Sequence, residues 1–549
     1  MSGQSIGRSS AILASGTLIS RILGLVSALV LAAALGQLGV GDAFALANQL
    51  PNNIYAIIAG GLLSAILVPQ IVRAEKHPDG GQLYINRLIT LGLVVFLLIA
   101  VLATVAAPLL VDFYSQQGGE GSRGLDPADR ELANLFAYWC LPQIFFYAVY
   151  SLLGEVLNAR RVFGPFTWAP VVNNVIAIGG LVAFIVMFGA DPANAEGEDW
   201  TTGMIALVAG SATLGVVVQA AFLMLFWRRS GLSYRPDFRW RGVGLGTAGK
   251  AAAWTFAMIT VTQLAGVVQN RVASLASGEG ASINTLRFSW LIFMLPHSIA
   301  AVSIATPYFT RMSGSARDGD FAAVRRDLSS SLRGIGVILV FAAVGLVVLA
   351  YPFSALFSVS GGTVDFATVS QMAPVVIFYL LGLIPFSVLF VLQRTFYALE
   401  DTRTPFFFTV LQSSLFVLGA LVVATWPTSV IAIGIAAVTS IAGTVQFLTA
   451  ALILRRRLGG IDAKRVLRQY ALYLLASLPA AAVGVGLLFV MGGTVAGGFA
   501  VSSLLNALLS MAAIGTAMAG VYFGVLWLLR VAELRAFVGP LLARIRRRS

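Results

Sequence analysis

The stretch LITLGLVVFLLIAVLATVAAPLLV, residues 88–111, holds no charged side chain, no asparagine and no glutamine. An α-helix rises 1.5 Å per residue, so this stretch would be about 36 Å long, and the hydrocarbon core of a bilayer is about 30 Å thick. An uninterrupted apolar segment of this length is typical of a transmembrane helix. The segment therefore predicts an integral membrane protein.

Similar apolar stretches recur along the whole chain of 549 residues, of which 58% are hydrophobic and 11% charged, with a mean hydropathy of +0.88. Soluble domains are about a quarter charged. We expect an all-α polytopic membrane protein with about fourteen transmembrane helices. The first apolar stretch is too long for a cleaved signal peptide. The predicted spans are 11–35, 46–72, 88–111, 132–157, 167–189, 203–227, 250–274, 284–310, 334–356, 370–397, 405–425, 429–454, 470–491 and 502–529.

The placement of basic residues predicts the orientation of these spans. If the amino terminus lies inside, the inner segments hold all of the 36 Lys and Arg residues except Arg21, Arg123, Arg130, Arg271 and Arg287. This bias follows the positive-inside rule, so we expect both termini to be cytoplasmic. The net charge of +13 then reflects topology and favours anionic lipid of the inner leaflet, and we expect no nucleic acid as a partner.

Two short motifs recur about half a chain apart. LPNNI at residues 50–54 corresponds to LPHSI at 295–299, and the segment 160–166 corresponds to 400–406. The offsets are 245 and 240 residues, a distance that covers six spans, and an even number of spans keeps both copies the same way up. We interpret this as a parallel repeat of two six-helix lobes, as in some secondary transporters, with coincidence as the alternative.

Motifs for catalysis or metal binding are weak. Cys140 is the only cysteine, and His77 and His297 are the only histidines, which excludes an internal disulfide and a histidine-rich metal site. GLGTAGKA at 244–251 matches the P-loop pattern in part. A P-loop follows a strand and has a Ser or Thr after its lysine, whereas here an Arg-rich loop precedes the motif and Ala251 follows Lys250. We expect no catalytic residue, metal or cofactor, and no enzymatic activity.

Asp126 and Asp129 are the best candidates for a paired-carboxylate site, because both lie in the largest outer loop. Asp126 precedes Pro127, and proline is favoured at the first position of a helix. We therefore interpret the two aspartates as the start signal of the fourth span, and acid/base catalysis is the alternative.

Arg21 lies ten residues into the first span, about 15 Å deep. An arginine at this depth costs about 2.5–3.5 kcal/mol unless it meets water or an anion. We interpret Arg21 as a cavity-lining, anion-binding residue, and a structural hydrogen-bond clamp is the alternative.

The other polar residues near the spans have more ordinary alternatives. Arg271 and Arg287 lie near the outer ends of the seventh and eighth spans, where their long side chains can reach the interface. Gln263 and Asn270 on the seventh span are the type of residue that forms hydrogen bonds between helices. Asp42, in the outer turn before the second span, is the nearest carboxylate to pair with an arginine.

Several motifs resemble the MurJ/MviN lipid II flippases, a branch of the multidrug/oligosaccharidyl-lipid/polysaccharide exporters. They are ASGTLISRILG at 14–24, GDAF at 41–44, LPN at 50–52, LNARRVF at 157–163 and FYALEDTRTP at 396–405. The resemblance covers about residues 10 to 530. It implies an alternating-access transporter that moves undecaprenyl-diphosphate carrying a disaccharide-pentapeptide to the outer leaflet of the bacterial cytoplasmic membrane, for peptidoglycan synthesis. Cell-wall synthesis proteins are expected partners.

The resemblance also implies four parts of the chain. They are an N-terminal lobe at 1–229, a C-terminal lobe at 230–457, a lipid-tail groove made by the last two spans at 458–530, and a basic cytoplasmic tail at 531–549.

The functional residues of the family carry over only in part. Arg21 and Asp42 match, but Ser27, Tyr55 and Ala56 stand where many members have arginines. Trp290, Leu291 and Met294 stand where members have Asp-Arg and a glutamate, and the seventh span lacks the acidic residue of a proposed sodium site. We therefore expect Arg287, one turn before Leu291, to replace the missing arginine. The candidate headgroup-binding residues are Arg21, Asp42, Arg287, Arg271, Asn52, Gln263 and Asn270.

Three other functions remain open. A sister exporter of another polyprenyl-linked glycan would share the fold. An exporter of cationic drugs would share it too, but a buried carboxylate would be expected there, and no Asp or Glu lies mid-span. A polytopic glycosyltransferase would need an acidic pair such as Asp126 and Asp129. A scaffold protein without transport would leave Arg21 unexplained.

Overall fold

The computed structural model describes residues 3–74, 79, 81–118, 123–160, 162, 164–231, 233–239 and 245–535. Arg161 and Phe163 of the motif at 157–163, Gly244 of the P-loop-like motif, and residues 536–549 of the basic tail lie outside this part of the chain.

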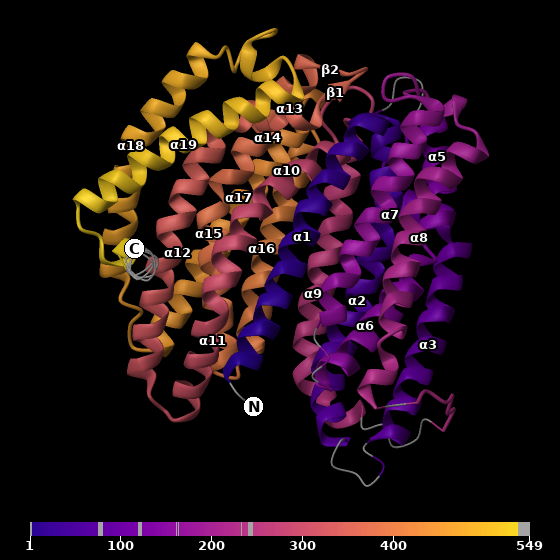
Figure 1. The fold of residues 1–549 in the computed structure, drawn as a ribbon, viewed down its shortest axis with the longest axis vertical. Helices are drawn as coiled ribbons and strands as arrows, with labels where there is room; N and C mark the ends of the chain where they lie inside the picture. Colours follow the sequence, from indigo (N-terminus) through magenta and orange to yellow (C-terminus); the bar gives the residue numbers. More distant parts are fainter. Residues whose placement is uncertain are drawn as a thin grey trace. The chain divides into compact units, whose positions relative to one another are not determined.

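The chain divides into two compact units, Met1–Asn284 and Thr285–Ser549. The first unit is a bundle of helices (Figure 1). Its elements are α1 (Gly3–Leu35), α2 (Val40–Ala74), α3 (Gln82–Val105), α4 (Ala107–Tyr114), α5 (Pro127–Cys140), α6 (Gln143–Ala159), α7 (Gly164–Phe188), η1 (Gly197–Asp199), α8 (Thr202–Met224), η2 (Trp227–Ser230) and α9 (Leu245–Ser274).

The second unit begins within α10 (Ile283–Pro296) and holds the described remainder of the chain. Its other elements are η3 (His297–Ala301), α11 (Val302–Arg317), α12 (Phe321–Val348), α13 (Ala350–Phe357), an antiparallel pair β1 (Val359–Ser360) and β2 (Thr363–Val364), α14 (Phe366–Leu381), α15 (Leu383–Ala398), α16 (Arg403–Val423), α17 (Thr428–Arg457), α18 (Ala463–Val490), η4 (Phe499–Val501) and α19 (Leu504–Leu528).

The predicted polytopic all-α architecture is confirmed. Among the described residues, 11 helices are long and apolar enough to cross a membrane, or 12 if the bent pair α14 and α15 counts as one span. Helices α2 and α9 cover the two other predicted stretches. The predicted count of about fourteen is compatible with this arrangement, although the structure does not fix it.

The two units break their helices at corresponding positions. Helix α3 gives way to α4 at Ala106, and α12 gives way to α13 at Leu349, 243 residues later. The α5–α6 break at Leu141 corresponds to the α14–α15 break at Gly382, 241 residues later. Two helix breaks in each unit thus recur in the same order and at a nearly constant offset. The repeat indicated by the short motifs is therefore a property of the whole fold.

Helix α1 packs against α7 through small residues spaced four apart. A Cβ added at Gly16 would lie 3.1 Å from the indole of Trp168, and one added at Gly24 would face the amide of Asn174. The same amide donates a hydrogen bond of 2.9 Å to the carbonyl oxygen of Ser20. Small side chains let the two backbones approach, and the asparagine then bonds across the contact.

Helix α9 belongs to the first unit, where it packs on α4 and on α2, which lies beside it in Figure 1. The sequence assigned the corresponding span to a second lobe that begins at residue 230. The boundary between the two compact units therefore lies between residues 284 and 285. The predicted lobes are defined differently, by six spans each, and their boundary at 229 and 230 remains a prediction.

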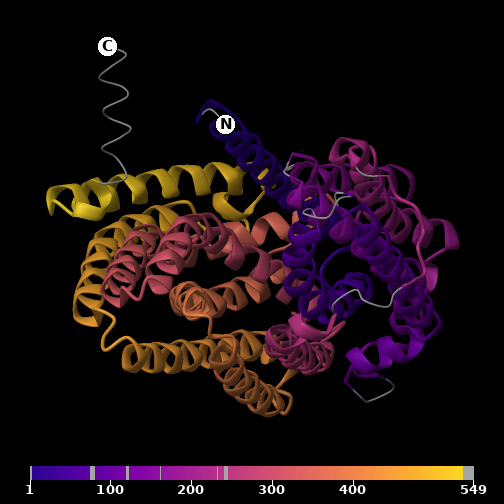
Figure 2. The ribbon, with the colours of Figure 1, turned by 90° about the horizontal axis from the view of Figure 1, so that it is seen from below.

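The last two long helices lie along one side of the second unit (Figure 2). Helix α18 packs on α12, and the hydroxyl of Tyr470 donates a hydrogen bond of 3.0 Å to the carbonyl of Leu332. The hydroxyl of Tyr522, on α19, donates to the carbonyl of Val337 at 2.9 Å. These contacts attach the appended helices by buried polar bonds as well as by apolar packing.

Candidate functional site

Asp42 is fully buried at the start of α2, where it accepts hydrogen bonds from the segment that follows α9. Its Oδ2 accepts a hydrogen bond of 2.8 Å from the Ser277 hydroxyl, and its Oδ1 accepts one of 2.8 Å from the backbone N–H of Asn284. The Asn284 amide in turn donates to the carbonyl of Gly36 at 3.0 Å. Asp42 thus links the α1–α2 turn to the segment after α9, which is an anchoring role.

Arg271 caps the carboxyl end of α4. Its Nη1 donates to the carbonyl oxygens of Asp112 and Phe113 at 2.9 and 3.3 Å, and its Nη2 donates to Gln116 Oε1 at 2.7 Å. The last carbonyls of a helix lack intrahelical partners and carry the negative end of its dipole, so a guanidinium there is stabilising. The structure therefore gives Arg271 a local role in addition to any contact with a substrate.

Asn270 and Gln263 face different surroundings on α9. Asn270 is 5% exposed, and its Nδ2 makes no hydrogen bond within the described part of the chain. A buried amide without a partner is uncommon and indicates a site for water or for a ligand. Gln263, two turns earlier, is half-buried.

Asn52 follows Pro51 in the interior of α2, and its side chain is exposed. The next residue, Asn53, is buried. Because neighbouring side chains on a helix point about 100° apart, the pair places one amide inside the unit and one on its surface.

Arg21 is exposed on α1. It lies one residue beyond Ser20, whose carbonyl is bound in the α7 contact, so its side chain projects away from that contact. An exposed guanidinium is compatible with the anion-binding role, which stays a prediction.

Three of the predicted residues of the first unit lie at similar depth. Measured along the helix axes, Arg21 is about 21 Å from the end of α1, Gln263 is about 16 Å from the end of α9, and Asn52 is about 15 Å from Asp42. Asp42 and Asn284 together join these three helix ends: Asp42 accepts from Ser277 and Asn284, and Asn284 donates to Gly36. Asn270 and Arg271 lie much nearer to that end, so the six residues are spread along the helices of the first unit and do not form one compact cluster.

Arg287 belongs to the second unit, where it is half-buried on α10. Of the three positions where the resemblance implies charged residues, Trp290, Leu291 and Met294, the first lies in an aromatic cluster. Trp290 stacks on Phe293 with ring centroids 4.7 Å apart, and both rings contact Tyr379 and Phe386. Aromatic packing thus surrounds Trp290, and Arg287 is the residue predicted to supply positive charge on this helix.

Asp126 and Asp129 take the places that the helix-start interpretation predicts. Helix α5 begins at Pro127, Asp126 is its N-cap residue, and Asp129 is buried in its first turn. The Asp126 side chain makes no capping hydrogen bond, so only the position of the start signal is confirmed.

Sequence reasoning missed two polar features of the first unit. The first is the bidentate pair in which Arg130 donates to both oxygens of Asp112 at 2.7 Å. The hydrogen bond from Arg130 holds the pKa of the Asp112 carboxyl below its ordinary value. The pair joins α4 to α5 on the same short helix that Arg271 caps.

The second missed feature is a strap, residues 233–239, that lies in extended form along α3. The backbone N–H groups of Ser233, Arg235 and Asp237 donate to side-chain oxygens at 2.9, 3.3 and 3.1 Å. The acceptors are Gln82, Asn86 and Thr90, which are spaced four apart on one face of α3. Four helical residues rise about 6 Å and two extended residues about 6.6 Å, so the two polar rows match.

An ion pair closes the strap. Arg87 contacts Asp237 at 3.0 Å. The backbone N–H of Arg239 and the Arg87 guanidinium together hold the pKa of Asp237 below its ordinary value. The spacing of Gln82, Asn86 and Thr90 is visible in the sequence as a polar row on one face of a helix. The extended segment that donates hydrogen bonds to this row is visible only in the structure.

Comparison with known proteins identifies the family. The model of the family described as lipid II flippase MurJ matches residues 31–510. The probable lipid II flippase MurJ of Haemophilus influenzae is 27% identical over 406 residues, which are 71% of this chain and 75% of that protein. The corresponding protein of Vibrio cholerae is 28% identical over 408 residues, 72% of this chain and 74% of that protein.

Solved structures agree in fold. A lipid II flippase MurJ in an inward closed conformation has a TM-score of 0.70 at 20% identity and covers 94% of this chain and 99% of its own. A multidrug resistance MATE family transporter of the MOP superfamily, in an inward-facing conformation, has a TM-score of 0.63 at 16% identity, covering 82% of this chain and 99% of its own. Since the family model matches most of its length, this polytopic membrane chain belongs to the MurJ family of lipid II flippases.

Proposed function

We propose that this protein moves lipid II from the cytoplasmic to the outer leaflet of the bacterial cytoplasmic membrane for peptidoglycan synthesis. The observation that carries the proposal is the family match over residues 31–510. The proposal includes the predicted orientation, with both termini in the cytoplasm, and transport without catalysis by the protein itself.

The exposed guanidinium of Arg21 supports an anionic substrate. The headgroup of lipid II contains a diphosphate, and moving such a charge through hydrocarbon without compensation is prohibitively costly. An arginine deep in a span is tolerated when it faces water or pairs with an anion. A guanidinium also matches phosphate oxygens with two parallel hydrogen bonds.

The remaining predicted residues divide into two roles. Asn52, Gln263 and the unsatisfied amide of Asn270 offer neutral donors and acceptors for sugar hydroxyls and amides. Asp42 and Arg271 would act by fixing the end of α9, on which two of these amides lie. Arg287, in the second unit, would supply a second positive charge.

Alternating access follows from two repeated lobes, residues 1–229 and 230–457, that rock about a common axis. Related transporters have been solved in inward-facing and outward-facing conformations. We assign the lipid tail to a groove on residues 458–530, where Leu475, Leu478 and Leu505 are each more than 60% exposed. Inward-negative membrane potential would favour outward movement of the anion by about 2.3 kcal/mol per charge per 100 mV.

Depletion in cells provides the test. Depleting the protein should increase lipid II in the inner leaflet, lower its exposure to an external probe, and cause lysis. Expression of this chain should restore exposure in a strain that lacks its own flippase. Unchanged lipid II exposure together with accumulation of a different polyprenyl-linked glycan would reject lipid II as the substrate and support the sister-exporter function instead.

A further inference from the structure

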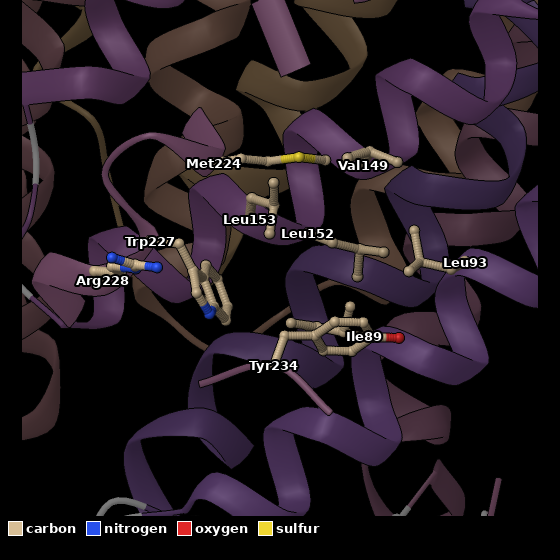
Figure 3. Close-up of a pocket in the computed structure, with 9 residues that line it drawn as sticks. All are labelled: Ile89, Leu93, Val149, Leu152, Leu153, Met224, Trp227, Arg228 and Tyr234. Atoms are coloured by element: carbon tan, nitrogen blue, oxygen red, sulfur yellow. The ribbon is translucent and has the colours of Figure 1, made fainter. Parts of the chain in front are cut away.

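A cavity of about 310 Å³ lies at the basic end of the first unit, and none of the predicted headgroup residues lines it. It is formed by α3, α6, the end of α8 with η2, and the strap. Figure 3 shows Leu152 and Leu153 between Trp227 and Leu93, with Arg228 at the edge. Nearly all of its lining is carbon, and Arg228 is its charged residue.

The mouth of the cavity has the character of a membrane interface. Met224, which lines the cavity, is 55% exposed, and the next residue, Leu225, is 75% exposed. Apolar side chains exposed at the end of a membrane helix face lipid, and the arginines that follow them mark the headgroup region. With the proposed orientation, this interface is the cytoplasmic one.

Charge around the cavity favours an anionic partner. The segments 82–90 and 224–239 hold five arginines and one acid, Asp237, and α6 adds a second acid, Glu155; the arginines are Arg87, Arg228, Arg229, Arg235 and Arg239. Asp237 is already paired with Arg87 and Arg239, at 3.0 and 3.5 Å. Arg229 lies over the ring of Phe226 at 4.9 Å, whereas Arg228 lines the cavity.

The size of the cavity selects the occupant. Its volume corresponds to roughly ten groups of the size of a water molecule or a methylene. This is enough for most of one phospholipid acyl chain and far too little for a polyprenyl tail of 55 carbons. The strap closes one side, because Tyr234 lines the cavity and its hydroxyl lies 3.0 Å from that of Thr90.

We propose that this cavity binds one acyl chain of an anionic phospholipid of the inner leaflet, with the headgroup phosphate on Arg228 and the strap docked over the chain. The assignment to the inner leaflet rests on the proposed orientation. The bound lipid would hold in place the connection between the sixth and seventh predicted spans, which joins the two repeats. Lipid composition would therefore act on the segment that links the repeats, at a site separate from the substrate.

Photolabelling tests the pocket. The full-length protein is placed in nanodiscs of phosphatidylcholine with a minority of phosphatidylglycerol whose acyl chain carries a diazirine, and the labelled peptides are mapped. Label should concentrate on the peptides that contain Leu93 and Leu153. Met224→Trp fills the cavity and should reduce this labelling several-fold, whereas Leu225→Trp, one residue away and outside the lining, should leave it unchanged.

The headgroup is tested with matched arginines. The wild-type pocket should take up the phosphatidylglycerol probe several-fold better than a phosphatidylcholine probe with the same chain. Arg228→Gln should remove this preference, and Arg229→Gln should retain it. Hydrogen exchange at Ser233, Arg235 and Asp237 should be slower in the presence of phosphatidylglycerol than in phosphatidylcholine alone, and Met224→Trp should abolish the difference.

Several results would overturn the proposal: equal labelling in wild type and Met224→Trp, no preference for phosphatidylglycerol, labelling by a free fatty acid probe alone, or displacement of the label by a polyprenyl phosphate. Because the measurement is binding and not transport, such a failure would leave the proposed flippase function untouched. A failure of lipid II transport would likewise leave the pocket result standing.

Discussion

The regions around Pro51 in α2 and Pro296 in α10 share a sequence motif but differ in helix geometry and in the surroundings of the residue after the proline. In α2 the helix continues through Pro51, and Asn52 is exposed. At the end of α10 the chain forms a turn of π-helix at His297–Ala301, and His297 is buried. Its Nδ1 lies 3.0 Å from the Ser387 hydroxyl, and its ring meets the rings of Phe386 and Phe390.

This difference shows that two copies of a repeat can take different roles. Both units keep the proline and the helix breaks, which are features of the backbone. The first unit has an exposed polar side chain, Asn52, at the position after the proline. The second unit has a buried histidine there, His297, which packs against aromatic rings. We infer that the first unit supplies most polar contacts to the headgroup and that the second supplies rigidity. Four predictions test this division.

The largest effect is expected from Arg21→Ala. Loss of a charge-assisted hydrogen bond of about 1.5–3 kcal/mol should reduce lipid II transport about ten- to a hundred-fold at normal membrane levels. Arg21→Lys should keep part of the activity, because a lysine retains the charge without the planar fork. Leaflet-resolved lipid II assays in complemented cells measure both. Arg317→Ala, at an exposed position at the end of α11, is the control, and full activity of Arg21→Ala would remove the anion-binding role.

Arg287→Ala should lower transport strongly, although less than Arg21→Ala. Leu291 is one turn further on the same helix, about 6 Å away, and both side chains are half-buried. The double variant Arg287→Ala with Leu291→Arg should recover much of the loss if a positive charge on this face is what matters. A fully active Arg287→Ala protein would indicate that Arg287 only reaches the interface, and the second unit would then contribute no charge.

The proline regions should respond to substitution in opposite ways. Asn52→Ala should lower transport a few-fold without changing thermal stability, since its side chain is exposed. His297→Ala should lower the free energy of unfolding by about 1–2 kcal/mol through loss of a buried hydrogen bond, with a smaller effect on transport per folded molecule. Thermal unfolding in detergent and transport assays separate the two. The reverse pattern would contradict the division between the units.

The smallest effect on transport is expected from Arg271→Ala. Removing a cation from the carboxyl end of α4 should cost about 1–2 kcal/mol of stability. Transport per folded molecule should fall less than in Asn52→Ala. Hydrogen exchange at the backbone of α4 should rise and thus report the lost cap. A transport defect as large as that of Arg21→Ala would instead make Arg271 a direct ligand of the headgroup.

The sequence by itself determined the membrane class, the approximate positions of the helices and the repeat. These properties depend on local hydropathy, on charge bias and on prolines and motifs that recur at a fixed offset, all of which are readable without knowledge of contacts. Arg21 was identifiable for the same reason, because a charge in an apolar span is conspicuous by its local cost.

The tertiary structure decided what each polar residue is used for. Asp42 and Arg271 are predicted headgroup residues, and the fold adds a second role, because they also hold Asn284 and the end of α4. The row Gln82, Asn86 and Thr90 looked unremarkable until an extended strap supplied the matching backbone donors. These hydrogen bonds join groups that lie up to 248 residues apart, and residue type alone does not identify the partner. Only the fold, by bringing distant donors and acceptors within 3 Å, assigns each polar group to packing or leaves it available for a substrate.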